Sequence, residues 1–234
     1  VMIKPQIWVS RGQFTGFIKM NNDAEWLQLE ATYSKFILEY ARLAEDVHAD
    51  IFCIGTELET FIDNRPDYWK SLIKDIRKLY SGKLTYAANW DKFEKITFWD
   101  DLDYIGIDAY FPLVNEKTPN VDVLKTAWKA PLSKIQKLHN ETKIPILFTE
   151  FGYMSVDGSA YNTWELEAKV ESIPTNEQAQ VNALEALFET FWEKDWWAGG
   201  FLWKWFPEMQ GHEGYPERDY TPQGKQAEHI IRKW

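Results

Sequence analysis

The chain has 234 residues, of which 45% are apolar and 16% aromatic, and its formal net charge is −10. That length predicts one large domain or two small ones, and the negative charge argues against nucleic acid or an anionic membrane surface as a partner. The single cysteine, Cys53, excludes an intramolecular disulfide and a multi-cysteine metal site. No run of 18 apolar residues is present, which argues against membrane insertion.

The first predicted element is a strand over residues 1–9. Polar and apolar side chains alternate there, so that Lys4, Gln6 and Trp8 share one face, as in a barrel strand whose other face packs on helices. Pro5 within it favours an edge or a bulge. No signal peptide is visible, and a chain that opens inside a strand is expected to lack residues before Val1. The compartment stays open, with a slight preference for a secreted or periplasmic protein.

Strands and helices alternate along the rest of the chain. After a loop at 10–21, Asn22 and Glu25 form a capping-box pattern that predicts a helix to about Val47. Apolar runs predict strands, and three-to-four spacing predicts helices. The further strands are expected at 51–55, 84–89, 104–108, 145–150 and 200–205, and the further helices at 66–82, 93–99, 121–140, 177–194 and 222–232, with loops at 56–65, 109–120 and 151–176.

This alternation requires a parallel sheet with helices outside it. A doubly wound sheet is the alternative, but no glycine-rich phosphate turn follows any strand. Polar and aromatic residues gather at the carboxyl ends of the strands, where active sites of (β/α)8 TIM barrels lie. Six βα units are present where a closed barrel needs eight. We therefore predict a single barrel domain over 1–234 that is incomplete at its N-terminus, with the missing pair before Val1.

Two of the predicted strands end in a carboxylate, Glu57 and Glu150. Alternation puts Cys53, Gly55 and Glu57 on one face, with the bulkier Phe52 and Ile54 facing the helices. In the same way Ile146, Phe148 and Glu150 share a face, so both acids are expected to point over the barrel mouth. Glu59 competes with Glu57, since it lies two residues further on.

Paired carboxylates at a barrel rim point to glycosidic bond cleavage. That reaction needs one protonated and one ionised carboxyl group, about 5–5.5 Å apart in retaining enzymes. The alternative is that either acid only caps a loop or forms a salt bridge. The 13 Trp, 11 Tyr and 14 Phe fill a core and also suit stacking against sugar rings.

Four segments together resemble a known family. IFCIGTELE, YIGIDAYFPL, ILFTEFGYMSVDG and GGFLWKWFP are similar, in this order, to glycoside hydrolase family 113, the β-mannanase family of the clan A barrels. The resemblance runs from KPQIW at residue 4 to the last strand. It implies that the six strands are numbers three to eight of the barrel.

The resemblance also implies the reaction and its two catalytic residues. Glu57 would end the fourth barrel strand as the general acid/base, and Glu150 would end the seventh as the nucleophile. The implied enzyme is a retaining endo-β-1,4-mannanase that cleaves β-mannan or manno-oligosaccharides, although relatives differ in substrate. One departure is Thr56, which stands where the clan has an asparagine that binds the sugar 2-hydroxyl.

Further rim residues are candidates for substrate binding. Tyr110 is expected to hydrogen-bond Glu150 and keep it ionised, or else to pack as a loop aromatic. Asp108 would bind a sugar hydroxyl, fix Tyr110 or cap a loop. Trp203 is a candidate stacking floor. The candidate walls and hydrogen-bond donors are Trp8, Trp90, Trp164, Lys4 and Gln6, for which core packing, or for Lys4 a buried ion pair, is the alternative.

Other function classes are less well supported. The four histidines lie in helical or late-loop stretches rather than in a metal-ligand cluster, and no G-x-S-x-G elbow is present. We expect no metal and no cofactor. The main rival is a barrel retained as a non-catalytic glycan-binding or tail-assembly module. A clan A enzyme for another β-glycan and an inverting glycosidase remain open, as do chain-length preference and oligomeric state.

Overall fold

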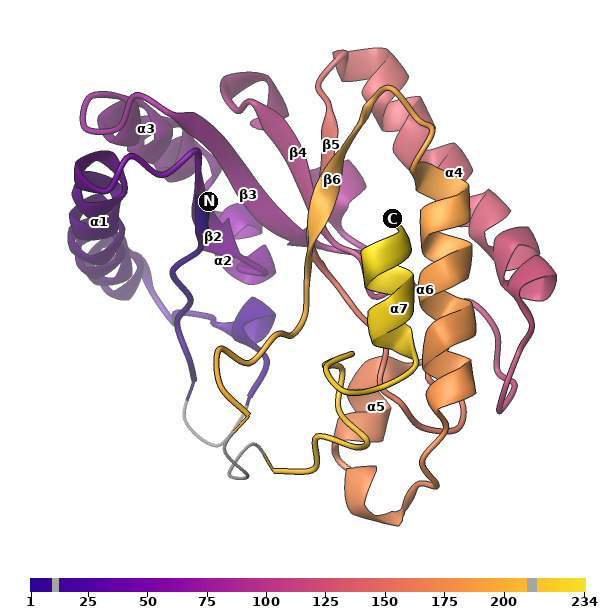
Figure 1. Ribbon diagram of the computed structural model, residues 1–234. Helices are drawn as coiled ribbons and strands as arrows, with labels where there is room; N and C mark the ends of the chain where they lie inside the picture. Colours follow the sequence, from indigo (N-terminus) through magenta and orange to yellow (C-terminus); the bar gives the residue numbers. More distant parts are fainter. Residues whose placement is uncertain (10–12, 210–213) are drawn as a thin grey trace. The chain divides into compact units, whose positions relative to one another are not determined.

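The computed structural model describes residues 1–9, 13–209 and 214–234. Its six strands form one sheet in the order of the chain. The pairs β1–β2 and β2–β3 are parallel, and a helical segment follows each strand from β2 to β6 (Figure 1). The strands are β1 (Met2–Ile3), β2 (Ile51–Thr56), β3 (Lys83–Asn89), β4 (Tyr104–Asp108), β5 (Ile146–Phe151) and β6 (Trp197–Leu202). This is the architecture of part of a TIM barrel; which barrel strands these are remains a prediction.

Seven α-helices and four short 3-10 turns connect the strands within the described residues. The helices are α1 (Asp23–Asp46), α2 (Glu59–Asn64), α3 (Pro66–Arg77), α4 (Val121–Thr142), α5 (Thr163–Glu167), α6 (Glu177–Phe191) and α7 (Ala227–Lys233). The 3-10 turns are at Thr15–Phe17, Phe93–Lys95, Trp99–Asp101 and Val170–Ser172.

The start of α1 confirms the predicted cap. The Glu25 backbone N–H donates to the side chain of Asn22 at 3.0 Å, which satisfies one of the free donors of the first turn. The carboxylate of Glu25 turns back to accept from the backbone N–H of Asn21 at 2.9 Å. The reciprocal bond of the capping box is therefore made one residue earlier than the usual pattern.

The chain divides into two compact units, Val1–Ile107 with Thr142–Leu147, and Asp108–Glu141 with Phe148–Trp234. In the first unit, α1 packs on α3 and on β2, as the indigo and purple segments of Figure 1 show. Tyr33, Trp69 and Tyr86 are buried between these elements, and the ring centroids of Tyr33 and Trp69 are 5.5 Å apart. The hydroxyl of Tyr33 donates to the carbonyl of Ile54 at 2.8 Å.

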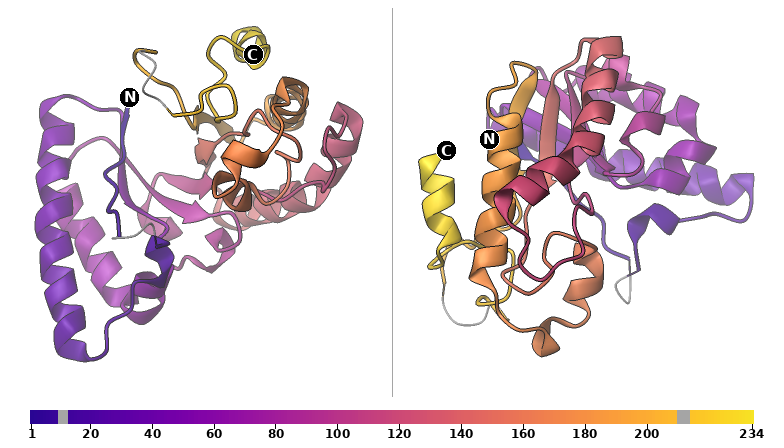
Figure 2. Two further views of the ribbon diagram at one scale, coloured as in Figure 1. Left: turned by 90° about the horizontal axis from the view of Figure 1, so that it is seen from below. Right: turned by 90° about the vertical axis from the view of Figure 1, so that its right-hand side faces the viewer.

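The second unit has its core between β5 and the helices α4, α6 and α7. Phe148 and Phe151 of β5 contact Phe191 and Phe188 of α6, at centroid distances of 4.9 and 5.8 Å. Trp128 of α4 contacts Phe191 from the other side at 5.1 Å. Helix α7 lies along α6 (Figure 2). Aromatic packing on α6 thereby fixes the carboxyl-terminal half of β5.

The face assignments made from alternation are wrong at two positions. A Cβ on Gly55 would lie 2.9 Å from the Tyr33 hydroxyl and 3.0 Å from Trp69, so Gly55 faces the helices. The cause is an irregular register between Cys53 and Thr56, because an inserted residue reverses the alternation. Phe148 also faces the helix layer, through Phe191, rather than sharing an interior face with the acid that follows it.

Several predicted boundaries are also wrong. The strand predicted at 1–9 covers only Met2–Ile3, and Pro5, which cannot donate to a ladder, lies just beyond it. The loop predicted at 56–65 contains α2, and the loop at 151–176 contains α5, because helices of six and five residues are too short to show a period. The last strand begins three residues earlier than predicted, and the closing helix begins at Ala227. The predicted loop at 10–21 includes residues 10–12, which lie outside the described residues.

Candidate active site

Glu150 is the best-defined carboxylate of the predicted site. It lies near the end of β5 and is partly exposed, between the buried residues Thr149 and Phe151. The hydroxyl of Tyr110 donates to its carboxylate at 2.8 Å. The hydrogen bond predicted from the sequence is therefore present, and it fixes the orientation of the Glu150 carboxylate.

Neighbouring bonds position Tyr110. The backbone N–H of Ala109 donates to the carbonyl of Glu150 at 2.7 Å, which extends the β4–β5 ladder past Asp108. The carboxylate of Asp108, which is 1% exposed, accepts from the Thr149 hydroxyl at 2.8 Å. Asp108 and Tyr110, from the end of β4 and the loop after it, are thus each hydrogen-bonded to β5 within the second unit, Asp108 to Thr149 and Tyr110 to Glu150.

The environment of Tyr110 keeps its hydroxyl protonated. Burial raises the pKa of Tyr110 well above its usual range, and the negative charge of Glu150 raises it further. A phenol in such a place is a hydrogen-bond donor at all ordinary pH values. Tyr110 therefore supplies a fixed donor to the nucleophile candidate.

Glu57 directly follows β2, in the first unit, on an unusual backbone. Its φ angle is 51°, in the left-handed region, which a non-glycine residue occupies at a cost of about 1–2 kcal/mol. Its N–H donates to the carbonyl of Ala87 at 2.9 Å, and the next N–H, of Leu58, donates to the buried Tyr86 hydroxyl at 2.7 Å. These bonds hold the strained turn, and strain of this kind is concentrated at functional sites.

The competing acid, Glu59, begins the short helix α2. Its carboxylate lies 3.9 Å from the ammonium of Lys92 and hydrogen-bonds the side chain of Asn89. Burial raises the pKa of Glu59, and the nearby Lys92 opposes that rise. An acid that begins a helix and faces a lysine has a sufficient structural role, which favours Glu57 over Glu59 as the catalytic residue.

The remaining candidates of the first unit lie on less regular chain. Lys4 and Gln6 are partly buried beyond the end of β1, Trp8 is 81% exposed, and Trp90 is partly buried just after β3. The strand alternation used to point Lys4, Gln6 and Trp8 inward is therefore wrong, since none of them lies on a strand. Their role in substrate binding stays a prediction.

Trp203 and Trp164 belong to the second unit. Trp203 follows β6, and its N–H donates to the carbonyl of Phe151 at 2.8 Å. Its side chain packs against a buried cluster of Met154, Val156 and Tyr220, on which Tyr110 also packs. The peptide bond after Trp203 is cis. Trp164, on α5, is 46% exposed and so is not a core residue.

Sequence reasoning missed residues brought in by the last loop. The ring of Tyr220 lies 6.1 Å from that of Tyr110. Asp219 accepts an ion pair from Lys204 at 2.9 Å, next to Trp203 in the chain. No predicted helix or strand covers residues 214–221, so the sequence carries no local signal for these contacts.

Two further findings apply to the described residues alone. They contain no group of three or more His, Cys, Asp or Glu side chains that could hold a metal ion; His212 lies outside them. No helix among them is long and apolar enough to cross a membrane.

The fold and these rim residues define the class: a glycoside hydrolase with a TIM-barrel-like fold. The family model described as Glycoside Hydrolase Family 113 matches residues 1–225, and the chain belongs to this family. Among curated proteins, none matches this chain.

Solved structures agree with this assignment. A GH113 β-mannanase from Alicyclobacillus acidocaldarius, in complex with ManMIm, is 26% identical, with a TM-score of 0.85 over 99% of this chain and 71% of that chain. A second GH113 β-1,4-mannanase, in a complex, is 26% identical with a TM-score of 0.84, over 99% and 72%. A β-glucuronidase from Ruminococcus gnavus, 17% identical with a TM-score of 0.69 over 95% of this chain and 38% of that chain, shares the fold.

Proposed function

We propose that this protein is a retaining endo-β-1,4-mannanase that cleaves β-mannan or manno-oligosaccharides with Glu150 as nucleophile and Glu57 as general acid/base. Membership of the family and the likeness to two GH113 mannanases support the substrate class. The hydrogen bond from Tyr110 to Glu150, at 2.8 Å, is the observation that carries the mechanism. We also propose that β1 to β6 are strands three to eight of the barrel.

In the first proposed step, the ionised carboxylate of Glu150 attacks the anomeric carbon. The bond to the leaving oxygen breaks, and Glu57 gives its proton to that oxygen. Tyr110 orients one oxygen of the Glu150 carboxylate and leaves the other to react. A partly exposed strand-end carboxylate held by one buried donor suits this role.

In the second step, Glu57 takes a proton from water, and the water oxygen attacks the anomeric carbon of the glycosyl-enzyme intermediate. Glu150 leaves as a carboxylate, and the anomeric configuration of the substrate is retained. Glu57 must therefore switch between acid and base. Hydrogen bonds from the N–H groups of Glu57 and Leu58 fix its strained backbone. This supports a role in which the fold holds the carboxyl group in a defined position.

The substrate-binding part of the proposal rests on the aromatic residues. Trp203 would form the floor under the sugar at the cleavage point, because it packs on the same cluster as Tyr110. Trp8, Trp90 and Trp164 would contact sugar units of the glycan further from the cleavage point. Lys4, Gln6 and Asp108 would hydrogen-bond the sugar hydroxyl groups. An apolar ring face and neutral hydroxyl groups suit this surface better than a charged ligand.

Release of reducing sugar from β-mannan tests the proposal. We expect release by the wild-type protein and none by Glu150→Ala, with Glu59→Gln as a matched control that retains most activity. Activity in Glu150→Ala equal to wild type would overturn the assignment of the nucleophile. Wild-type release from β-glucan or xylan but not from mannan would overturn the substrate, and binding of mannan without release would favour a non-catalytic module.

A further inference from the structure

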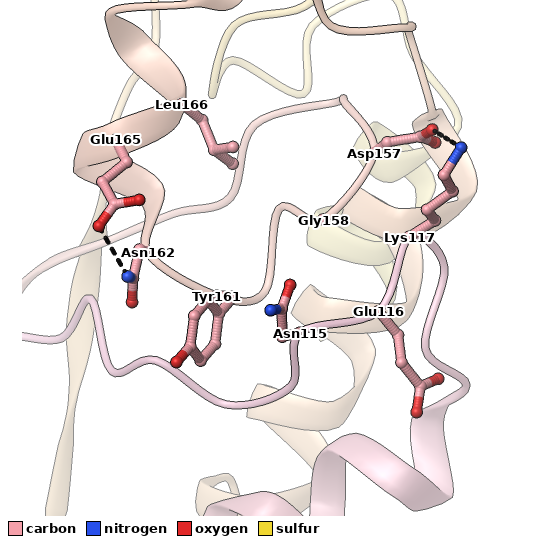
Figure 3. Close-up of a pocket in the computed structure, with 9 residues that line it drawn as sticks. All are labelled: Asn115, Glu116, Lys117, Asp157, Gly158, Tyr161, Asn162, Glu165 and Leu166. Atoms are coloured by element: carbon pink, nitrogen blue, oxygen red, sulfur yellow. Dashed lines mark hydrogen bonds and ion pairs between the residues drawn. The ribbon is translucent and has the colours of Figure 1, made fainter.

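The second unit contains a pocket of about 350 Å³ formed by segments 115–117 and 157–166 (Figure 3). The first segment belongs to the loop after β4 and the second to the loop after β5. An ion pair between Lys117 and Asp157, at 3.4 Å, lies on one side of the pocket. A hydrogen bond from Asn162 to Glu165, at 2.9 Å, lies on the other (Figure 3). The volume falls within the usual range of small-molecule sites.

Hydrogen bonds tie the two loops together around the pocket. The Gly158 N–H donates to the carbonyl of Lys117 at 2.9 Å, and the side-chain amide of Asn176 bonds both Asp157 at 2.7 Å and Thr118 at 2.6 Å. Asn176 also caps α6, through the N–H of Ala179 at 3.0 Å. The pocket is thus preformed and anchored to a long helix, which lowers the ordering cost of binding.

The lining favours a neutral, hydroxyl-rich ligand with an apolar face. Tyr161 is 37% exposed and offers a ring face, and Asn115 and Asn162 offer amide groups that both donate and accept. Glu116 and Glu165 are acceptors for hydroxyl groups and leave the lining net negative, since Lys117 is already paired with Asp157. A negatively charged sugar would be repelled here.

The pocket lies on the same two loops that begin at the proposed catalytic group. Asn115 is five residues beyond Tyr110, so the two Cα atoms are at most about 18 Å apart. Asp157 is seven residues beyond Glu150, a separation of at most about 25 Å. An oligosaccharide of several units is long enough to extend from Glu150 to the pocket within either limit.

We propose that this pocket is a distal subsite for one neutral hexose unit of the glycan chain, with Tyr161 as its stacking platform. The inference rests on the proposed function, because it takes the β-mannan chain as the ligand. It predicts that Tyr161 contributes to the binding of long chains and not of short ones. Loss of one stacked ring corresponds to about five- to tenfold in affinity.

The test uses calorimetric titration of Glu150→Ala protein, which binds without turnover, with mannohexaose and mannotriose. Adding Tyr161→Ala should weaken mannohexaose binding about five- to tenfold and leave mannotriose binding unchanged. Tyr161→Phe keeps the ring and should bind as the parent does. The matched control is Tyr40→Ala on α1, since Tyr40 is also 37% exposed and should change neither titration.

Each of the other outcomes contradicts either the subsite or the proposed substrate. Mannohexaose binding unchanged by Tyr161→Ala overturns the subsite and leaves the proposed function intact. Equal weakening of both sugars also overturns it, because Tyr161 would then act on the catalytic region. Failure of the Glu150→Ala parent to bind either sugar, in the presence of wild-type release from another glycan, overturns the proposed substrate and with it the mannan subsite.

Discussion

The hydrogen bond between Tyr110 and Glu150 gives the sharpest prediction. Tyr110→Phe keeps the ring, and with it the contact to Tyr220 at 6.1 Å, but removes the donor that lies 2.8 Å from the Glu150 carboxylate. A hydrogen bond to a charged group contributes about 1.5–3 kcal/mol. Because Glu150 is partly exposed, water replaces part of the bond, and the lower end, about 1.5–2 kcal/mol, applies.

That loss corresponds to a decrease in kcat/KM of about 10- to 30-fold. Initial rates on a soluble manno-oligosaccharide measure it, with circular dichroism to show that the fold is kept. Because the pKa of Tyr110 is raised well above its usual range, the hydroxyl is still a donor at pH 9, and the decrease should persist up to that pH. The matched control is Tyr80→Phe, whose hydroxyl donates to the neutral carbonyl of Ala49 at 2.6 Å and should change stability but not kcat/KM.

Two results would refute this reasoning. An unchanged kcat/KM in Tyr110→Phe would mean that the hydrogen bond does not act on the reacting carboxylate. A decrease of the same size in Tyr80→Phe would mean that loss of any buried hydroxyl disturbs the enzyme, and the effect would then say nothing about Glu150.

Three further predictions concern other parts of the structure. Glu57→Ala should reduce activity strongly on natural glycans and much less on substrates with activated leaving groups, which need little acid help. The Glu57→Gly protein should be more stable than the Glu57→Ala protein by about 1 kcal/mol, because glycine adopts the positive φ of 51° at this position without strain. Gly152→Ala should destabilise the fold by about 1–3 kcal/mol, since the added Cβ would lie 2.0 Å from the carbonyl oxygen of Trp203. In Gly158→Ala the added Cβ meets nothing within 4 Å, so this variant should cost only backbone strain. Lys225 is buried against Ser155 and Asp219, and burial lowers its pKa to about 8. Between pH 8 and the ordinary pKa of lysine, the unfolded chain therefore binds more protons than the folded chain, and stability should rise with pH in that window.

Simple measurements check these three. Equal loss of Glu57→Ala activity on both kinds of substrate would contradict the acid role. Thermal melts compare Gly152→Ala with Gly158→Ala, and equal melting temperatures would contradict the close approach of Trp203 to Gly152. Melts from pH 7 to pH 10 should show the rise in the wild type and not in Lys225→Met; the same slope in both would mean that Lys225 is not its source.

Local signals in the sequence were enough to predict most of the elements. Asn22 and Glu25 mark the start of α1, and Pro66 begins α3, because caps and proline act within one turn. The apolar runs of β2 to β5 were found to within about two residues. The order of strands and helices then predicted a barrel-type fold, and the family and the solved structures support that class.

The errors come from interactions that are not local. The face of the sheet on which Gly55 lies depends on an irregularity in the pairing of β2 with β3. The alternation of side chains along a single strand does not predict such an irregularity. β1 ends at Ile3, the last residue that pairs with β2, although the alternation of side chains continues beyond it. In the second unit, alternation gave the wrong face for Phe148, whose contacts are to α6.

The candidate site shows the same limit. Chemistry at strand ends predicted Asp108, Tyr110 and Glu150, and the structure joins Tyr110 to Glu150 by a hydrogen bond of 2.8 Å, while Asp108 accepts from Thr149, next to Glu150 in β5, at 2.8 Å. Tyr220, which lies 110 positions beyond Tyr110 in the chain, packs near Tyr110, and the backbone after Glu57, which has a positive φ, is held by a hydrogen bond to Tyr86. Neither feature has a signal within its own segment.

Identifying the residue that carries the glycosyl-enzyme intermediate tests the role of Glu150 directly. Incubation with a 2-deoxy-2-fluoro-mannoside bearing an activated leaving group slows the second step, and peptide mass mapping then locates the trapped sugar. We expect the added mass on the peptide that contains Glu150, and on Glu150 itself. A sugar attached to any other carboxylate, Glu57 and Glu59 included, would contradict it.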